Sequence, residues 1–420
     1  MIWLKYIRNN PEEIKDSIKK RWGNIDIDAF LKLDREVVDL KNKLDELRAV
    51  KNTVSKEIPK LQNEEKQAKI KEMKEIWENI KTLESTLWEK EEIFFNMHIK
   101  IPNILDESTS VWETDEDNVL ESKFMEPTKF DFTPKPHYEI WEKKWWIDTE
   151  KGSEICGSRF WYIKWDLVLL QFALVNYAMS KLVWEEKFEP ILPPVLVKER
   201  AMFWTWYFPA DEDWVYAVNP WDDDLYLVWT AEVPVTSYHS WEIMDLDEPK
   251  KYVWYSSCFR REAWSAWKDT RWILRWHQFE KVEMVCFCKP SDSRKVHDYM
   301  VKIEEDIWQW LKIPYQKMNV CSWDLWNPAM KKYDLEAWMP WQEKYREVTS
   351  CSNVWEYQAR RLWIRYREED WTLETAHTLN GTVIAIWRCL IAIIENYQTE
   401  NGDVMIPEVL RPYMFWKDKI

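Results

Sequence analysis

The 420-residue sequence predicts an α+β protein, in which a long helical hairpin precedes a domain built on a mainly antiparallel sheet flanked by helices. Two observations lead to this prediction. Residues 26–100 repeat apolar side chains at helical spacing and contain few turn signals, whereas residues 125–420 mix short β-rich runs with helical segments. We expect two regions, 1–110 and 111–420, with a polar, acidic linker that extends to residue 118.

The first region should form two long helices that pair along apolar seams. Their apolar positions recur at intervals of three and four: Phe30, Leu33, Val37, Leu40, Leu44 and Leu47, then Ile70, Met73, Trp77, Ile80, Leu83 and Leu87. Pro59 and the polar residues 62–65 lie between the two runs, which predicts an antiparallel hairpin with its tip near residues 59–65. Arms of roughly 35 residues would reach about 50 Å.

The charge of the chain restricts how it could bind nucleic acid. With 59 Lys and Arg against 74 Asp and Glu, the formal net charge is −15, which excludes a polycation that coats nucleic acid. Between Arg48 and Lys74, however, eight basic residues outnumber four acidic ones. A solvated helix face would account for this run, and so would a surface that contacts phosphates.

The cysteines and the apolar stretches indicate a cytoplasmic protein. Seven cysteines, an odd number without paired secreted-type spacing, are expected to be free thiols. Cys286 and Cys288 are better explained as alternate residues of one strand than as zinc ligands. The amino terminus lacks the pattern of a secretory signal, and no run approaches 18 uncharged apolar residues, so we expect no membrane segment.

A strand, a long loop and a second strand are predicted between Cys258 and Glu283. Because the chain has no G-x-x-x-x-G-K-[ST] loop, charged side chains would have to hold the phosphates of any bound nucleotide. Arg260 and Glu262 are two residues apart and should share one face of the sheet, where an arginine can clamp a phosphate and a carboxylate can accept from an adenine amine. Phe279 could stack on a base. A cross-strand ion pair is the alternative interpretation.

Two later segments carry further polar groups. Residues 336–353 alternate in strand fashion and place Glu347 beside several hydroxyls, a setting in which carboxylates near phosphates hold Mg²⁺. Residues 377–388 run from a polar strand end into an apolar helix that contains Arg388. Each segment alone is ambiguous.

Together, the order and spacing of these segments resemble bacterial seryl-tRNA synthetases, which are class II aminoacyl-tRNA synthetases, over essentially the full chain. The matching stretches are 188–194 (motif 1), the triplet Thr230-Ala-Glu232, 259–279 (motif 2), 376–388 with 395–398 (motif 3), and the carboxyl-terminal signature 409–414. The resemblance implies a catalytic region with an antiparallel sheet, a homodimer, and an arm, residues 26–100, that grips the long variable arm of tRNA(Ser).

The same resemblance implies activation of L-serine by ATP, with Mg²⁺, and transfer of serine from seryl-adenylate to the 3′ end of tRNA(Ser). Use of tRNA(Sec) stays open. The serine site would comprise Thr230, Ala231, Glu232, Glu283, Asn380 and Thr382. The ATP site would comprise Arg260, Arg261, Glu262, Trp276, Phe279, Glu347, Val348, Thr349, Ser350 and Arg388, with Glu347 as the magnesium ligand.

The sequence argues against three other functions. An arm-bearing relative could charge a different amino acid, but the intact Thr230–Glu232 triplet and Glu283 argue against it. A non-catalytic tRNA-binding paralogue should lack Arg260, Glu262, Glu347 or Arg388, and all four are present. A purely structural coiled coil would leave the region after the arm without a role.

The composition is anomalous, with 5 Gly against 33 Trp. Tryptophan occupies positions that the family fills with glycine: 165, 229, 264, 267, 272, 341 and 387. Trp338 matches a genuine tryptophan, and Trp276 stays open. Our hypothesis is that most of these letters are glycine in the living protein, encoded by UGA and written as tryptophan, because so many Gly→Trp changes would overpack the fold.

Overall fold

The structure is a computed structural model of residues 1–420, and it describes all of them except 113, 210–211, 220 and 263–275. The chain divides into two compact units, Met1–Ile104 and Leu105–Ile420. We describe each unit by itself. Trp264, Trp267 and Trp272 of the glycine hypothesis lie outside the described residues.

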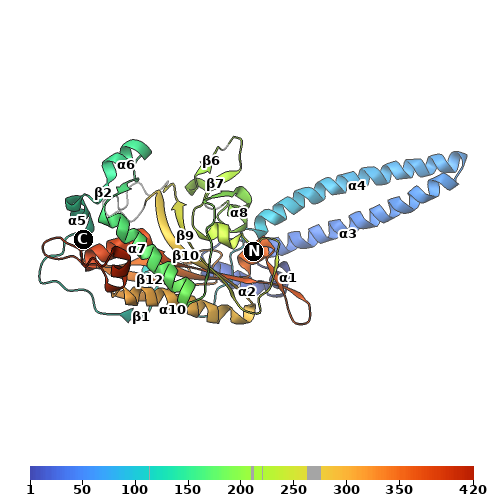
Figure 1. Ribbon diagram of the computed structural model, residues 1–420. Helices are drawn as coiled ribbons and strands as arrows, with labels where there is room; N and C mark the ends of the chain where they lie inside the picture. The colour runs from blue at the N-terminus through green and yellow to red at the C-terminus, as the bar shows by residue number, and fades with distance from the viewer. Residues whose placement is uncertain (113, 210–211, 220, 263–275) are drawn as a thin grey trace. The chain divides into compact units, whose positions relative to one another are not determined.

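The first unit contains the predicted hairpin (Figure 1). Its elements are α1 (Leu4–Asn9), α2 (Pro11–Lys20), α3 (Ile27–Glu57), a 3₁₀ turn (Ile58–Lys60) and α4 (Asn63–His98). Helix α3 begins where the Asp26 carboxylate accepts from the backbone N–H of Ala29 at 2.9 Å, an ordinary N-cap. Pro59 lies in the turn between the long helices, so the predicted tip is confirmed.

The seam between α3 and α4 follows the predicted spacing with one correction. Val37, Leu44 and Ile80 are buried in it as expected. Trp77, however, is half exposed, and the adjacent Ile76 is buried in its place. A steady spacing of three and four through Met73, Ile76 and Ile80 keeps smaller side chains on the contact face and directs the indole outward.

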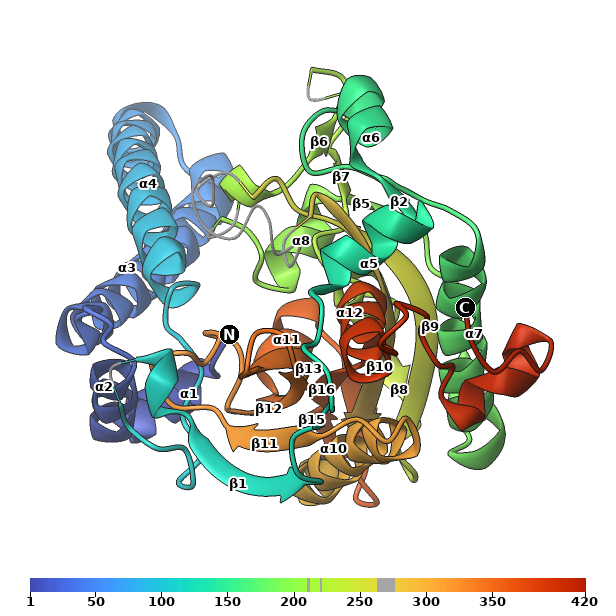
Figure 2. The same ribbon diagram turned by 90° about the vertical axis from the view of Figure 1, so that its left-hand side faces the viewer.

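An eight-stranded, mainly antiparallel sheet is the centre of the second unit as described, which confirms the predicted fold class (Figure 2). Its strand order is β1 (Val119–Phe124), β11 (Tyr315–Asn319), β12 (Lys331–Met339), β13 (Lys344–Trp355), β16 (His377–Ala385), β10 (Gln278–Cys288), β9 (Lys250–Phe259) and β4 (Glu189–Pro190). Only the β4–β9 pair of this sheet is parallel among the described strands.

The residues of strand β10 point alternately to the two faces of the sheet. Val282, Met284 and Cys286 point to one face, where they join the main hydrophobic core with α7 (Asp166–Ser180), α10 (Ser293–Trp310) and α12 (Ile386–Asn396). The intervening residues, including Phe279 and Glu283, point to the opposite face by strand alternation. That second face carries another apolar cluster, which includes Val285 and Phe287, and beside it the polar residues Lys281 and Glu283; we call it the polar face.

Shorter elements surround the sheet. The helices are α5 (His137–Lys144), α6 (Thr149–Cys156), α8 (Glu199–Trp204), α9 (Glu232–Thr236) and α11 (Tyr357–Leu362). The remaining strands are β2 (Ile147–Asp148), β3 (Tyr162–Ile163), β5 (Leu196–Lys198), β6 (Ala217–Val218), β7 (Leu225–Leu227), β8 (Ile243–Met244), β14 (Arg365–Arg367) and β15 (Leu373–Thr375). By length and composition, Asp166–Glu185 is the one described helical stretch that could cross a membrane, and half of its apolar window is buried in the fold, as core helices are.

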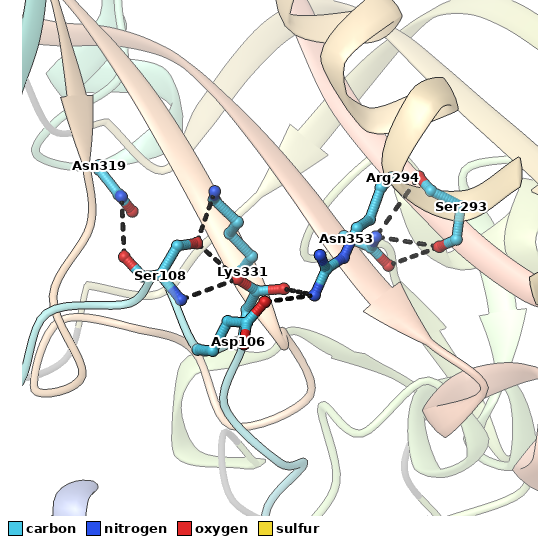
Figure 3. Close-up of polar contacts among 8 residues, drawn as sticks. Asp106, Ser108, Ser293, Arg294, Asn319, Lys331 and Asn353 are labelled. Carbon is cyan, nitrogen blue, oxygen red and sulfur yellow. Dashed lines mark hydrogen bonds and ion pairs between the residues drawn. The ribbon is translucent and has the colours of Figure 1, made fainter. Parts of the chain in front are cut away.

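The acidic stretch after residue 104 is more than the linker that the sequence predicts. Figure 3 shows that polar contacts join it to the rest of the second unit. Asp106 is buried, its carboxylate accepts from Arg294 at 3.2 Å, and the Ser108 hydroxyl accepts from Lys331 at 2.8 Å. The Ser108 carbonyl also accepts from the Asn319 amide at 3.1 Å. This segment is therefore docked on the sheet by basic side chains of α10 and β12.

Nine described tryptophans have a backbone φ between 56° and 83°, in the left-handed region that favours glycine: 22, 145, 165, 206, 241, 355, 363, 371 and 416. Two described glycines also have a positive φ, Gly157 at 99° and Gly402 at 83°. Trp145 shows the local reason. Its N–H bonds the Glu142 carbonyl at 3.1 Å and the next N–H bonds the Trp141 carbonyl at 2.9 Å, a helix ending that glycine usually closes.

Candidate active site

A cavity of about 300 Å³ lies on the polar face of the sheet. Ten of the residues predicted from the sequence line it: Arg260, Glu262, Trp276, Phe279, Glu347, Val348, Thr349, Ser350, Thr382 and Arg388. They come from β10, β13, β16, the start of α12 and the connection between β9 and β10. Residues that are more than 120 positions apart in the chain are therefore brought to one place.

Both strands of the predicted strand–loop–strand arrangement are present, as β9 and β10, with one correction; residues 263–275 of the predicted loop lie outside the described residues. Strand β9 ends at Phe259, so Arg260 and Glu262 follow the strand instead of sharing one of its faces. Glu262 has φ 47°, which turns the chain at this point. Both side chains still line the cavity because the turn directs them there.

Arg260 lies between two aromatic rings. Its guanidinium carbon is 3.6 Å from the ring centroid of Trp229 and 4.9 Å from that of Phe279, and its Nε donates to the Trp229 carbonyl at 3.3 Å. Cation–π contacts of this kind hold a guanidinium flat against the rings. The cavity therefore offers a positioned cation beside an aromatic face.

Glu232 is a buried carboxylate at the start of α9. It accepts from the Gln358 amide at 2.6 Å and from the Tyr207 hydroxyl at 3.1 Å. Burial raises the pKa of Glu232 to about 7, and the nearby Glu283 carboxylate adds to the rise while these hydrogen bonds oppose it. Glu232 can therefore change its charge near neutral pH.

Glu283 lies on β10, directly opposite Thr382 of β16. Its Oε2 accepts from the Thr382 hydroxyl at 3.1 Å and pairs with the Lys281 ammonium at 2.6 Å. Asn380, two residues before Thr382, is buried, and its side-chain nitrogen has no hydrogen-bond partner among the described residues. A buried donor left without an acceptor is costly, so this amide is available to a ligand.

Glu347 and Arg388 form an ion pair at the other side of the cavity. The Arg388 Nη1 lies 3.2 Å from the carboxylate and donates to the Glu347 backbone carbonyl at 2.8 Å. Although desolvation raises it, the charges of Arg388 and Lys332 bring the pKa of Glu347 below its usual value. Glu347 therefore favours its anionic form, and its side chain is about half exposed (47%).

Six predicted residues do not line this cavity. Thr230 and Ala231 are buried just before Glu232. Glu232, Glu283 and Asn380 are also buried, and of these three Glu283 is the one hydrogen-bonded to Thr382. Arg261 has an exposed side chain, and its backbone N–H donates to the Trp214 carbonyl. The predicted residues thus fall into an open cavity and a buried polar cluster, which meet at Thr382.

Tryptophans crowd one wall of the cavity. The rings of Trp161 and Trp276 have centroids only 3.2 Å apart, and Trp387 lies 5.0 Å from Trp161 and 6.2 Å from Trp276. Aromatic pairs ordinarily keep centroids 4.5–7 Å apart. The wall is therefore overfilled by the residues written in this sequence.

Sequence analysis missed several residues of the site. Tyr207 and Gln358 hold Glu232, and neither stands in a motif that the sequence singled out. Lys281 and Glu280 line the cavity, and Lys281 could have been found because it alternates with Phe279 and Glu283 along one strand. Trp387, which stands at a position that the family fills with glycine, also lines the cavity.

Two family models match the chain. The seryl-tRNA synthetase N-terminal domain matches residues 1–105, and the tRNA synthetase class II core domain (G, H, P, S and T) matches residues 214–397. The second match contains most of the cavity residues described above. Each unit of the structure thus has a counterpart in a known family.

Full-length relatives agree with these matches. The serine–tRNA ligase of Thermodesulfovibrio yellowstonii is 41% identical over 99% of both chains. The crystal structure of seryl-tRNA synthetase from Pyrococcus horikoshii complexed with ATP is 36% identical, has a TM-score of 0.91, and aligns over 100% of this chain and 99% of that one. The cytoplasmic serine–tRNA ligase of Naegleria fowleri in complex with AMP is 33% identical, has a TM-score of 0.87, and aligns over 99% and 96% of the two chains. With such identity along its whole length, the chain belongs to the seryl-tRNA synthetase family.

Proposed function

We propose that this protein is a serine–tRNA ligase that activates L-serine with ATP and transfers it to the 3′ end of tRNA(Ser). One observation carries the proposal: the cavity joins a cation and an aromatic face for a nucleotide to a buried cluster of carboxylates and hydroxyls for a small polar amino acid. A relative that charges another amino acid would not need two carboxylates, Glu232 and Glu283, beside Thr382.

The buried cluster fits serine. Glu232 can bind the ammonium group, Thr382 and Glu283 can bind the hydroxyl, and the unpaired Asn380 amide can donate to a substrate oxygen. Thr230 and Ala231 form the wall beside Glu232. A site that bonds the hydroxyl rejects alanine because its own polar groups would be left unpaired.

The open cavity fits ATP. Phe279 can stack on adenine, Glu262 can accept from its amine, and Arg260 and Arg388 can neutralise phosphates, while residues 348–350 close the site. The described residues hold no cluster of three metal-binding side chains, so Mg²⁺ would be held by Glu347 together with substrate phosphates, as this ion prefers. A bound Mg²⁺ would neutralise phosphate charge. The protein's own part is to align the serine carboxylate with the α-phosphorus, without a covalent enzyme intermediate.

The test is ATP–pyrophosphate exchange with the full-length chain, carrying glycine at the family's glycine positions. We expect exchange that depends on serine and is absent with alanine and threonine. Exchange with another amino acid, or none with any, would contradict the proposal.

A pH dependence of serine binding follows from Glu232. Its pKa of about 7 means that the carboxylate which attracts an ammonium group is formed as the pH rises through neutrality. The ionised fraction grows from about one tenth at pH 6 to about nine tenths at pH 8, so the KM for serine should fall about ninefold while the KM for ATP stays nearly constant. An E232Q variant should show a raised KM for serine without this slope, and a flat profile in the parent enzyme would contradict the assignment.

We also propose that the hairpin, residues 26–100 within the 1–110 region, binds tRNA(Ser), that residues 111–420 are the catalytic region, and that the enzyme is a homodimer. The hairpin tip supports the first point because Lys56, Lys60 and Lys66 are exposed there. Changing these three to glutamine should raise the KM for tRNA and reduce its salt dependence by about one unit of slope per lost phosphate contact. Serine-dependent pyrophosphate exchange should not change.

A matched variant separates the effect of the lysines at the hairpin tip from the effect of positive charge in general. Lys32, Lys41 and Lys43 are exposed on the first and middle turns of α3, away from the tip of the same hairpin. Changing these three to glutamine removes equal charge, and the KM for tRNA should respond less than it does at the tip. An equal response would show that the tip has no special part in binding.

We further propose that the organism is bacterial and that most of the anomalous tryptophans are UGA-encoded glycines. The left-handed backbone of nine tryptophans supports this, because a side chain in that region costs about 1–2 kcal/mol, whereas a whole domain has about 5–15 kcal/mol of stability. Trp165 belongs both to this group and to the positions that the family fills with glycine. Sequencing the gene decides the matter, since UGG codons at 165, 229, 341 and 387 would refute it.

A further inference from the structure

Lys281 is a buried lysine that the proposed mechanism does not use. It lies on β10 with its side chain 9% exposed, lines the cavity, and pairs with Glu283 at 2.6 Å. Removing an ammonium group from water is expensive unless a partner compensates it. The charge of this lysine is therefore compensated mainly by the Glu283 carboxylate.

The position of Lys281 lies between the two halves of the site. Phe279, Lys281 and Glu283 are alternate residues of one strand and share its polar face. Across the sheet, Lys281 is opposite Ser256 of β9 and Ala385 of β16, and Ala385 also lines the cavity. Its ammonium group thus stands between the proposed adenine ring and the carboxylate proposed for the serine hydroxyl.

The contacts of Glu283 are one-sided. The Lys281 ammonium lies 2.6 Å from Oε2, and the Thr382 hydroxyl donates to the same oxygen at 3.1 Å. Two donors on one oxygen fix the rotation of a carboxylate and direct its other oxygen. Oε1 is then the oxygen left for the hydroxyl of a bound amino acid.

We propose that Lys281 is a positioning residue for hydroxyl selectivity: it holds Oε2 of Glu283, so that Oε1 accepts the hydroxyl of the amino acid. The inference rests on the proposed function and deepens it. Lys281 acts through Glu283 and does not touch the reacting atoms.

The experiment compares K281M with the parent in pyrophosphate exchange, using full-length protein. A hydrogen bond to a charged group is lost, so the KM for serine should rise about 10- to 100-fold, and the preference for serine over alanine should fall by a similar factor. The KM for ATP should stay within about threefold. K281R, which keeps the charge, should restore most of the preference.

Lys317 supplies a matched control. It is a partly buried lysine of strand β11 in the same sheet, paired with Glu121 and Glu305 outside the cavity, and K317M should leave both KM values unchanged. If K281M fails to fold, K281Q keeps a donor without the charge and should raise the KM for serine alone.

Two kinds of result would overturn the inference. A rise in the KM for ATP equal to that for serine, or a fall in kcat with both KM values constant, would assign Lys281 to the phosphates or to the fold. A thermal shift assay distinguishes failure of this inference from failure of the proposed function. Serine should raise the melting temperature of the parent and not that of K281M. A parent that ignores serine would overturn both proposals, whereas equal responses of parent and variant would overturn only the role of Lys281.

Discussion

Glycine at Trp145, Trp165 and Trp371 should raise the free energy of unfolding of the full-length chain by about 1 kcal/mol at each position. All three have a backbone φ between 56° and 67°, where a Cβ atom is strained. Each indole is also at least 71% exposed, so little apolar burial is lost when it is removed. The sum of the three changes is measured by urea unfolding of the full-length chain, followed by circular dichroism.

Two sets of variants separate backbone strain from the loss of a large side chain. Alanine at the same three positions keeps the Cβ atom, so it should give little gain. Glycine at Trp77 and Trp88, which are exposed within helix α4, should instead destabilise the first unit by about 1 kcal/mol each. If the triple glycine variant is no more stable than the parent, tryptophan is tolerated at these positions and the glycine hypothesis loses its structural support.

The fold could be predicted well from the sequence because its strongest signals are periodic. The spacing of Val37, Leu44 and Ile80 identifies the hairpin, and Pro59 identifies its tip. The exposure of Trp77 could not be predicted, because Ile76 and Trp77 are both apolar and only packing against α3 selects the smaller side chain. The docking of Asp106 and Ser108 also depends on Arg294 and Lys331, which lie far away in the sequence.

The site was predicted in part, and the missing part has a physical reason. Residues in motifs, such as Arg260 and Glu347, could be assigned because their neighbours in the chain carry the resemblance. Tyr207 and Gln358 could not, because their importance comes only from hydrogen bonds to Glu232 across the fold. The charge behaviour of Glu232 likewise depends on burial, which no local pattern reveals.

The largest loss of activity is expected from Arg388→Ala. Arg388 is the cation at the start of α12 that pairs with Glu347 in the wall of the cavity, and we assign it to the γ-phosphate of ATP. The charge that develops on the leaving pyrophosphate would lose a fixed positive partner, so serine-dependent exchange should fall by about 10²–10³-fold, with kcat/KM for ATP as the measurement. Lysine keeps the charge but loses the planar fork, so R388K should retain an intermediate rate.

Arg346 makes the comparison with Arg388 specific. It precedes Glu347 on β13, donates to the Gln342 side chain at 2.8 Å, and does not line the cavity. R346A removes the same charge one residue from the same carboxylate, and exchange should stay within about threefold of the parent. Equal losses in both variants would mean that general positive charge, and not the position of Arg388, supports the reaction. A tenfold or greater difference between them, with both proteins melting at the parent temperature, would assign the effect to the geometry of the Arg388 guanidinium over the phosphates.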